Sequence, residues 1–245
     1  MRVFKNIFSI PLQEKDVGRY NKMDGLISLA FYVYYIVFLY LYGLLIFQTS
    51  IMKEMSKFFS NPYVFVFSVH LFVSIISVLP IFFVLHIRKQ TLVSIGFRFK
   101  KVLFSICLGI IGAIILTWSE FLAYFTDFES YPLHGNDLVF RLFDTFICIA
   151  LVEEIAFRGY IQTRILGLIR NKYVAIFVVG IMFSLMHIPF QMLQADMSLI
   201  DHIMVYYPNL IFHVIMHIVF VYLYTRNYEL IAPTITHALR NLLLI

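Results

Sequence analysis

Residues 142–161 read LFDTFICIALVEEIAFRGYI, an apolar run that places two adjacent glutamates and an arginine inside a candidate membrane helix. Inserting one ionised carboxylate into a bilayer costs roughly 2.5–3.5 kcal/mol on insertion scales, so each glutamate needs a partner or water. Glu154 and Arg158 are spaced i,i+4 and can form an ion pair on one helical face. Glu153 lies about 100° further round the helix and lacks that partner. Two carboxylates at this depth predict a functional site.

The chain as a whole is too apolar for a soluble domain. Of its 245 residues, 61% are hydrophobic and 13% are charged, whereas soluble domains have about 25% charged residues. We predict an all-α polytopic membrane protein, with residues 1–245 forming a single integral membrane domain. The net charge of +5 does not indicate a nucleic-acid partner, because the basic residues are spread over alternate loops.

Seven apolar stretches predict a bundle of about seven transmembrane helices (six to eight) around an intramembrane active site. They cover residues 25–47, 62–87, 102–125, 138–168, 173–190, 203–224 and 229–245. The first stretch is too long for the core of a cleaved signal peptide, so we expect it to remain in the mature protein.

The positive residues alternate between the two sides of this predicted bundle. From the first loop to the last, the numbers of Lys and Arg are five, two, five, none, four, none and one. Because cytoplasmic loops carry the excess of Lys and Arg, the N-terminus is predicted in the cytoplasm and the C-terminus outside. If the short last segment is re-entrant, the C-terminus returns to the cytoplasmic side.

Counting residues along the helices brings a histidine level with the glutamates. The polar triplet 170–172 is typical of the tip of a helical hairpin. Glu154 lies 17 residues before Asn171 and His187 lies 16 residues after it, so both are roughly 25 Å from the tip. A carboxylate and an imidazole at one depth could activate a water molecule.

The last predicted helix adds His237 and Asn241, which share a face because they are spaced i,i+4. His237 lies about 12 Å along the helix from Glu229, and an imidazole beside an amide could donate to a developing oxyanion. A single histidine in a membrane helix is as readily an interhelical hydrogen-bonding residue as a catalyst. Occurring together with the glutamate pair, these residues favour the functional interpretation.

Three short segments resemble, in order and spacing, the motifs of a known protease family. They are E-E-x-x-x-R (Glu153, Glu154, Arg158), F-x-x-x-H (Phe183, His187) and H-x-x-x-N (His237, Asn241). The family comprises the CAAX proteases and bacteriocin-processing enzymes, related to the type II CAAX prenyl endopeptidase. The resemblance covers residues 138–245. It implies an intramembrane peptide-bond hydrolase of a bacterial cell membrane, with a site reached from the cytoplasmic side.

The resemblance also implies a role for each motif residue. Glu153 is the general base, and His187 shares in orienting or activating the water. His237 and Asn241 stabilise the oxyanion, while Glu154 holds its helix in place. The predicted catalytic residues are Glu153, Glu154, His187, His237 and Asn241, with Arg158 and Phe183 as structural support.

The cofactor is left open at this point. The family is described both as metalloproteases and as glutamate-dependent proteases, and the chain has no HExxH zinc motif. If a divalent metal such as zinc is bound, the candidate ligands are Glu153, His187 and His237. His213 and His217 also have a metal-compatible spacing, but an interhelical hydrogen bond or a place in the site wall is favoured. Arg240 is expected to extend to the interface or pair with a carboxylate.

Two functions from different classes follow from this sequence. The first is an endopeptidase that cuts a small membrane-associated peptide or protein, in bacteriocin or signalling-peptide maturation or in self-immunity. The second is a non-catalytic membrane protein that confers immunity or regulates a partner by binding. All the motif residues are present, which favours catalysis. The expected partners are a peptide or membrane-protein substrate and the lipid bilayer.

Overall fold

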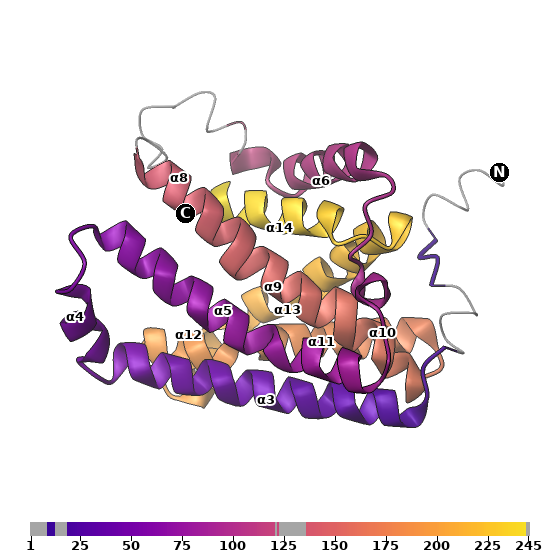
Figure 1. The fold of residues 1–245 in the computed structure, drawn as a ribbon, viewed down its shortest axis with the longest axis horizontal. Coiled ribbons are helices and arrows are strands. Elements are labelled where there is room, and N and C mark those ends of the chain that lie inside the picture. Colours follow the sequence, from indigo (N-terminus) through magenta and orange to yellow (C-terminus); the bar gives the residue numbers. More distant parts are fainter. Residues whose placement is uncertain (1–8, 13–18, 121, 123–135, 244–245) are drawn as a thin grey trace.

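The structure is a computed structural model that describes residues 9–12, 19–120, 122 and 136–243, and this part of the chain is helical without strands. Figure 1 shows the helices packed in one bundle, as predicted for an all-α membrane protein. The elements are α3 (Lys22–Phe47), α4 (Ile51–Ser56), α5 (Pro62–Ile87), η1 (Leu92–Ile95), α6 (Val102–Leu116), α8 (Asn136–Phe143), η3 (Asp144–Ala150), α9 (Leu151–Glu154), η4 (Ile155–Ile161), α10 (Gln162–Arg164), η5 (Ile165–Gly167), α11 (Lys172–Leu185), α12 (Ile188–Gln194), α13 (Leu199–Asn227) and α14 (Ile231–Leu243).

Within the described ranges, four helical segments are long and apolar enough to cross a membrane. They are Lys22–Phe47, Pro62–Ile87, Lys172–Gln194 and Leu199–Asn227, and Val102–Leu116 is a shorter apolar helix. The predicted stretch 102–125 therefore has a shorter helix at its start, and part of its remainder lies outside the described residues. The predicted last segment is α14, whose 13 residues make it about 20 Å long, less than a hydrocarbon core of about 30 Å.

The helix that carries the glutamates is continuous from α8 through α9 to α10 in Figure 1. It does not keep one helical geometry. Two π-helical segments, Asp144–Ala150 and Ile155–Ile161, flank the single α-helical turn that ends with the glutamates. Such i→i+5 segments are rare and often occur at functional sites.

The predicted hairpin tip at residues 170–172 is confirmed. The glutamate-bearing helix ends with η5 at Gly167, and α11 begins at Lys172. The Asn171 side chain accepts hydrogen bonds from the backbone N–H groups of Tyr173 and Val174, at 3.0 and 3.3 Å. This capping satisfies two of the unpaired donors at the start of α11.

Two glycines allow close approaches that position the site. A Cβ at Gly159 would collide with the backbone carbonyl oxygen of Ile95, so this glycine lets the glutamate helix rest on η1. At Gly109 a Cβ would lie 2.8 Å from the carbonyl oxygen of Ala232. The Thr236 hydroxyl donates to the Gly109 carbonyl at 2.8 Å. Helix α14 is thereby held against α6, which fixes the position of the histidine that follows Thr236.

Candidate functional site

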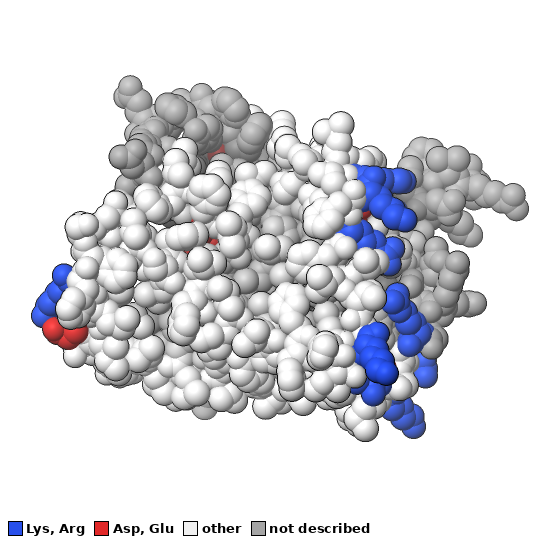
Figure 2. Space-filling view, viewed as in Figure 1, with Lys and Arg blue, Asp and Glu red and all other residues white. Residues whose placement is uncertain are grey.

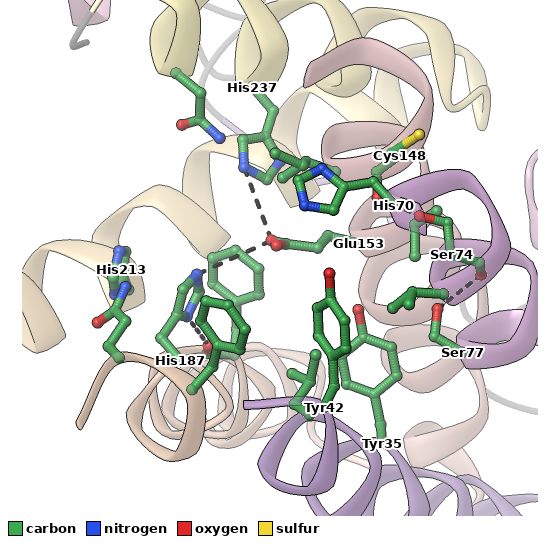
Figure 3. Close-up of a pocket in the computed structure, with 18 of the residues that line it drawn as sticks. Tyr35, Tyr42, His70, Ser74, Ser77, Cys148, Glu153, His187, His213 and His237 are labelled. Atoms are coloured by element: carbon green, nitrogen blue, oxygen red, sulfur yellow. Dashed lines mark hydrogen bonds and ion pairs between the residues drawn. The ribbon is translucent and has the colours of Figure 1, made fainter. Parts of the chain in front are cut away.

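The predicted site residues meet in one cavity of about 480 Å³ inside the bundle. Its walls come from α3, α5, the glutamate helix, α11 to α13, and α14, and they include Glu153, His187, His237 and Asn241. The residues that depth counting placed level with each other therefore lie together. Figure 3 shows Glu153 between His187 and His237, with the aromatic rings of Tyr35 and Tyr42 below it.

The Glu153 carboxylate faces both imidazoles without a direct hydrogen bond. Its Oε2 lies 4.0 Å from His187 Nε2 and 3.8 Å from His237 Nε2. This oxygen is buried and has no hydrogen-bond partner among the described residues. A buried carboxylate oxygen without a partner is costly, which indicates that something else occupies the space between the three side chains.

Glu154 has a different environment from its neighbour. It is fully buried, its Oε1 lies 3.1 Å from Arg158 Nη1, and the same oxygen lies 3.0 Å from His237 Nδ1. The predicted Glu154–Arg158 pair is confirmed. Glu154 thus connects the glutamate helix to α14 as well.

The Arg158 guanidinium is held between two aromatic rings. Its Cζ lies 4.1 Å from the ring centre of Phe183 and 4.6 Å from that of Phe220. Both distances are within the range of a cation–π interaction. Phe183, predicted as structural support, also meets the His187 ring edge-on at a centroid distance of 5.1 Å. One aromatic ring therefore supports the arginine and a histidine.

A break between α11 and α12 sets the orientation of His187. Pro189 has no N–H and disfavours a continuous α-helix here. In the turn before Pro189, the His187 N–H bonds to the Ser184 carbonyl at 3.2 Å instead of continuing the i→i−4 pattern. The freed Phe183 carbonyl accepts a hydrogen bond from His187 Nδ1 at 2.8 Å. Because a carbonyl only accepts, Nδ1 carries the proton, and when the ring is neutral Nε2 is an acceptor that faces Glu153.

On α14, His237 and Asn241 both lie on the cavity wall, as their spacing predicted. Arg240 Nη1 donates to Asn241 Oδ1 at 3.1 Å, which leaves the amide nitrogen of Asn241 as the free donor. The Arg240 guanidinium also lies over the Phe212 ring, at 4.9 Å. The sequence interpretation did not foresee that Arg240 contacts a candidate site residue.

The two histidines of α13 have separate contacts. The His213 ring stacks on the His187 ring with centroids 4.0 Å apart and 13° between planes. His217 is fully buried, and its Nε2 lies 2.9 Å from Gln162 Oε1. His213 also lines the cavity, so the two histidines take the two roles that the sequence favoured, although it did not show which histidine takes which.

Sequence reasoning missed the contribution of the first helices to the cavity. Tyr35 and Tyr42 of α3 line it, as does His70 of α5. His70 Nδ1 lies 2.9 Å from the Asp144 carboxylate of η3, the segment that precedes the glutamates. An isolated histidine in the apolar stretch 62–87 was the only signal for this pair, because the sequence does not indicate which helices are neighbours.

The candidate metal ligands fit a metal in chemistry but not in spacing. Two ligands of a tetrahedral zinc ion stand about 3.3 Å apart when each bond is 2.0–2.1 Å. The distances from Glu153 Oε2 to the two histidine nitrogens are 3.8 and 4.0 Å. No group of three or more His, Cys, Asp or Glu in the described part of the chain is arranged to hold a metal ion.

The part of the chain that carries most of this site is similar to one known family. Residues 135–243 match the family model of the type II CAAX prenyl endopeptidase Rce1-like proteins. The matched segment comprises 109 of the 245 residues. It contains all three motifs, with Glu153, Glu154, His187 and His237. This similarity indicates an intramembrane protease in general terms. No match was found among curated proteins or among solved structures.

Proposed function

We propose that this protein is an endopeptidase in which Glu153 activates a water molecule inside the membrane to hydrolyse a peptide bond. The observation that carries the proposal is the buried, unpartnered Oε2 of Glu153 between two imidazole nitrogens on a cavity wall. The similarity of residues 135–243 to the Rce1-like family provides independent support for peptide hydrolysis.

The spacing of the three side chains suits a water molecule. The Glu153–histidine distances of 3.8 and 4.0 Å exceed the 2.7–3.2 Å of an N–H···O hydrogen bond. One water about 2.8 Å from each atom would span both gaps with angles near 90°. Because Glu153 Oε2 and His187 Nε2 both accept, such a water would donate its two protons to them. A lone pair on its oxygen would then be free to attack a carbonyl carbon.

In the first step, the water oxygen bonds to the carbonyl carbon of the scissile peptide while Glu153 takes the proton. The carbonyl π electrons move to oxygen and form a tetrahedral oxyanion. In the second step, the C–N bond breaks and the proton moves from Glu153 to the leaving nitrogen. The products are a carboxylic acid and an amine, and Glu153 returns to its starting state.

Asn241 and His237 are the proposed donors to the oxyanion. The Asn241 amide nitrogen is available because its oxygen is bound by Arg240. His237 has Nδ1 against Glu154, so its Nε2 donates only when the ring carries both protons. When the His237 ring carries both protons, the charges of Glu153, Glu154, Arg158 and His237 sum to zero. Fixed donors aimed at a developing oxyanion are typically worth 10²–10³-fold in rate.

The proposed substrate is a small membrane-associated peptide or protein, with precursors of bacteriocins or signalling peptides as the first class to test. The cavity is lined mainly by apolar and aromatic side chains, among them Leu39, Phe190 and Met216. Such a wall would accept an apolar peptide segment, while the few polar groups fix its orientation.

The test is a cleavage assay with purified protein in detergent micelles and a panel of such precursors. We expect wild type to release two products whose new termini are identified by mass spectrometry, and Glu153→Gln to release none. If no precursor is cut, and wild type and Glu153→Ala protect cells equally against a bacteriocin, the protein acts by binding instead.

A further inference from the structure

The basic residues gather at one end of the bundle, here called the basic end. On the face seen in Figure 2, the Lys and Arg side chains gather there, while the opposite end carries a small mixed group. The basic end is where α3, α6 and α11 begin and where α5 and α13 end, at Lys22, Lys101, Lys172, Arg88 and Arg226. The opposite end carries α4, with Lys53, Glu54 and Lys57.

Hydrogen bonds join several of these helix ends. Arg88 Nε donates to Asp24 Oδ1 at 3.1 Å, which joins the end of α5 to the start of α3. The backbone N–H of Lys100 donates to Glu229 Oε1 at 3.0 Å, which joins the start of α6 to the turn before α14. The basic end is therefore one face of the molecule. Because short cytoplasmic loops carry the excess of Lys and Arg, this face is expected in the cytoplasm.

The catalytic cavity is closed toward the basic end. Along α5, the His70 side chain is 33% exposed on the cavity wall, and Ser77 is only 2% exposed. One turn nearer the basic end, Ile81 is completely buried in the main hydrophobic core. Along α3, Tyr42 is partly exposed, whereas Phe31 on the basic side belongs to that core. A packed core thus separates the cavity from the basic end.

The most exposed residue of the cavity lies at the other end. Gln194 is exposed and is the last residue of α12. Asn241 lies two residues before the end of α14, and Tyr42 lies five residues before the end of α3. These three residues line the cavity and lie at helix ends that face away from the basic end.

We propose that the cavity opens to the extracytoplasmic side of the membrane, so that the substrate is a peptide segment exposed in the outer half of the bilayer. The family resemblance implied access from the cytoplasm, and the burial gradient together with the charge distribution favours the opposite side. The choice of a peptide as occupant rests on the proposed function. The direction of opening does not.

The test measures thiol accessibility in intact cells and needs no catalytic activity. In a Cys107→Ser, Cys148→Ala background, single cysteines are introduced and treated with a membrane-impermeant maleimide before or after permeabilisation. Lys100→Cys at the basic end and Lys53→Cys on α4 report the orientation. Gln194→Cys reports the cavity mouth and Val73→Cys its wall.

We expect Lys53→Cys, Gln194→Cys and Val73→Cys to react in intact cells, and Lys100→Cys to react only after permeabilisation. The proposal is overturned if Gln194→Cys reacts only after permeabilisation. Gln194→Cys also decides the side if Val73→Cys reacts in neither preparation. Since labelling is independent of hydrolysis, a protein that cuts no peptide would still give a clear answer here.

Discussion

Replacing Arg158 by Met tests the buried ion pair beneath the site. Met keeps the length of the apolar stem but removes the charge that faces Glu154 at 3.1 Å. Breaking a buried pair by removing one partner typically costs about 3–5 kcal/mol, because the remaining charge stays buried without compensation. The cation–π interactions with Phe183 and Phe220 are lost as well. We expect Arg158→Met to destabilise the protein by about 3–5 kcal/mol.

Thermal unfolding in detergent, followed by the loss of the monodisperse peak on size-exclusion chromatography, measures this effect. At roughly 2–4 °C per kcal/mol for a chain of this length, the midpoint should fall by about 6–20 °C. Glu154→Gln should also destabilise the protein. The double variant should be less destabilised than the sum of the two, because residues in contact show coupling energies of about 0.5–3 kcal/mol.

The exposed pair on α4 provides a matched control. Lys57 Nζ lies 2.7 Å from Glu54 Oε2, yet these side chains are 62% and 59% exposed. Lys57→Met, Glu54→Gln and their double variant should therefore show almost no coupling, since water screens an exposed pair. If Arg158→Met leaves the midpoint unchanged, or if its coupling with Glu154→Gln is no larger than on α4, the reasoning about the buried pair is wrong.

Three further predictions concern the cavity itself. Pro189→Ala should let the helix continue, so that the Phe183 carbonyl bonds to the His187 N–H again. The imidazole would then be misplaced, and kcat should fall about 10–100-fold. A wild-type kcat would count against this explanation. Asn241→Leu should lower kcat about 10²–10³-fold by removing an oxyanion donor, and Arg240→Met should cause a smaller loss. Equal rates in wild type and both variants would exclude Asn241 as an oxyanion donor. A chelator should leave cleavage unchanged because the donor spacing is too wide for zinc, whereas activity lost with chelator and restored by zinc would assign a metal.

Depth along a helix was the property that the sequence predicted best. The rise per residue of a helix is nearly constant, so counting from a recognisable hairpin tip placed His187 level with the glutamates. His187 and Glu153 indeed face each other in one cavity, with Nε2 and Oε2 4.0 Å apart. The i,i+4 spacing predicted the Glu154–Arg158 pair. Depth counting and this spacing both depend only on the local geometry of a helix.

Contacts between distant helices could not be predicted in this way. The stacking of His213 on His187 and the place of Tyr35 beside Glu153 depend on which helices are neighbours, and an apolar sequence carries little information about that. The π-helical segments that flank the glutamates also left no recognisable pattern. The break at His187, by contrast, had a readable signal in Pro189, two residues later.

The division of labour between the two glutamates is the central claim, and one paired measurement tests it most directly. The cleavage rate and the unfolding midpoint are measured for Glu153→Gln and for Glu154→Gln. We expect the cleavage rate of Glu153→Gln to fall about 10²–10⁴-fold, because that is the typical contribution of a general base. Its unfolding midpoint should equal that of wild type. Glu154→Gln should mainly lower the midpoint. A Glu153→Gln variant that folds normally and cleaves at the wild-type rate would contradict the claim.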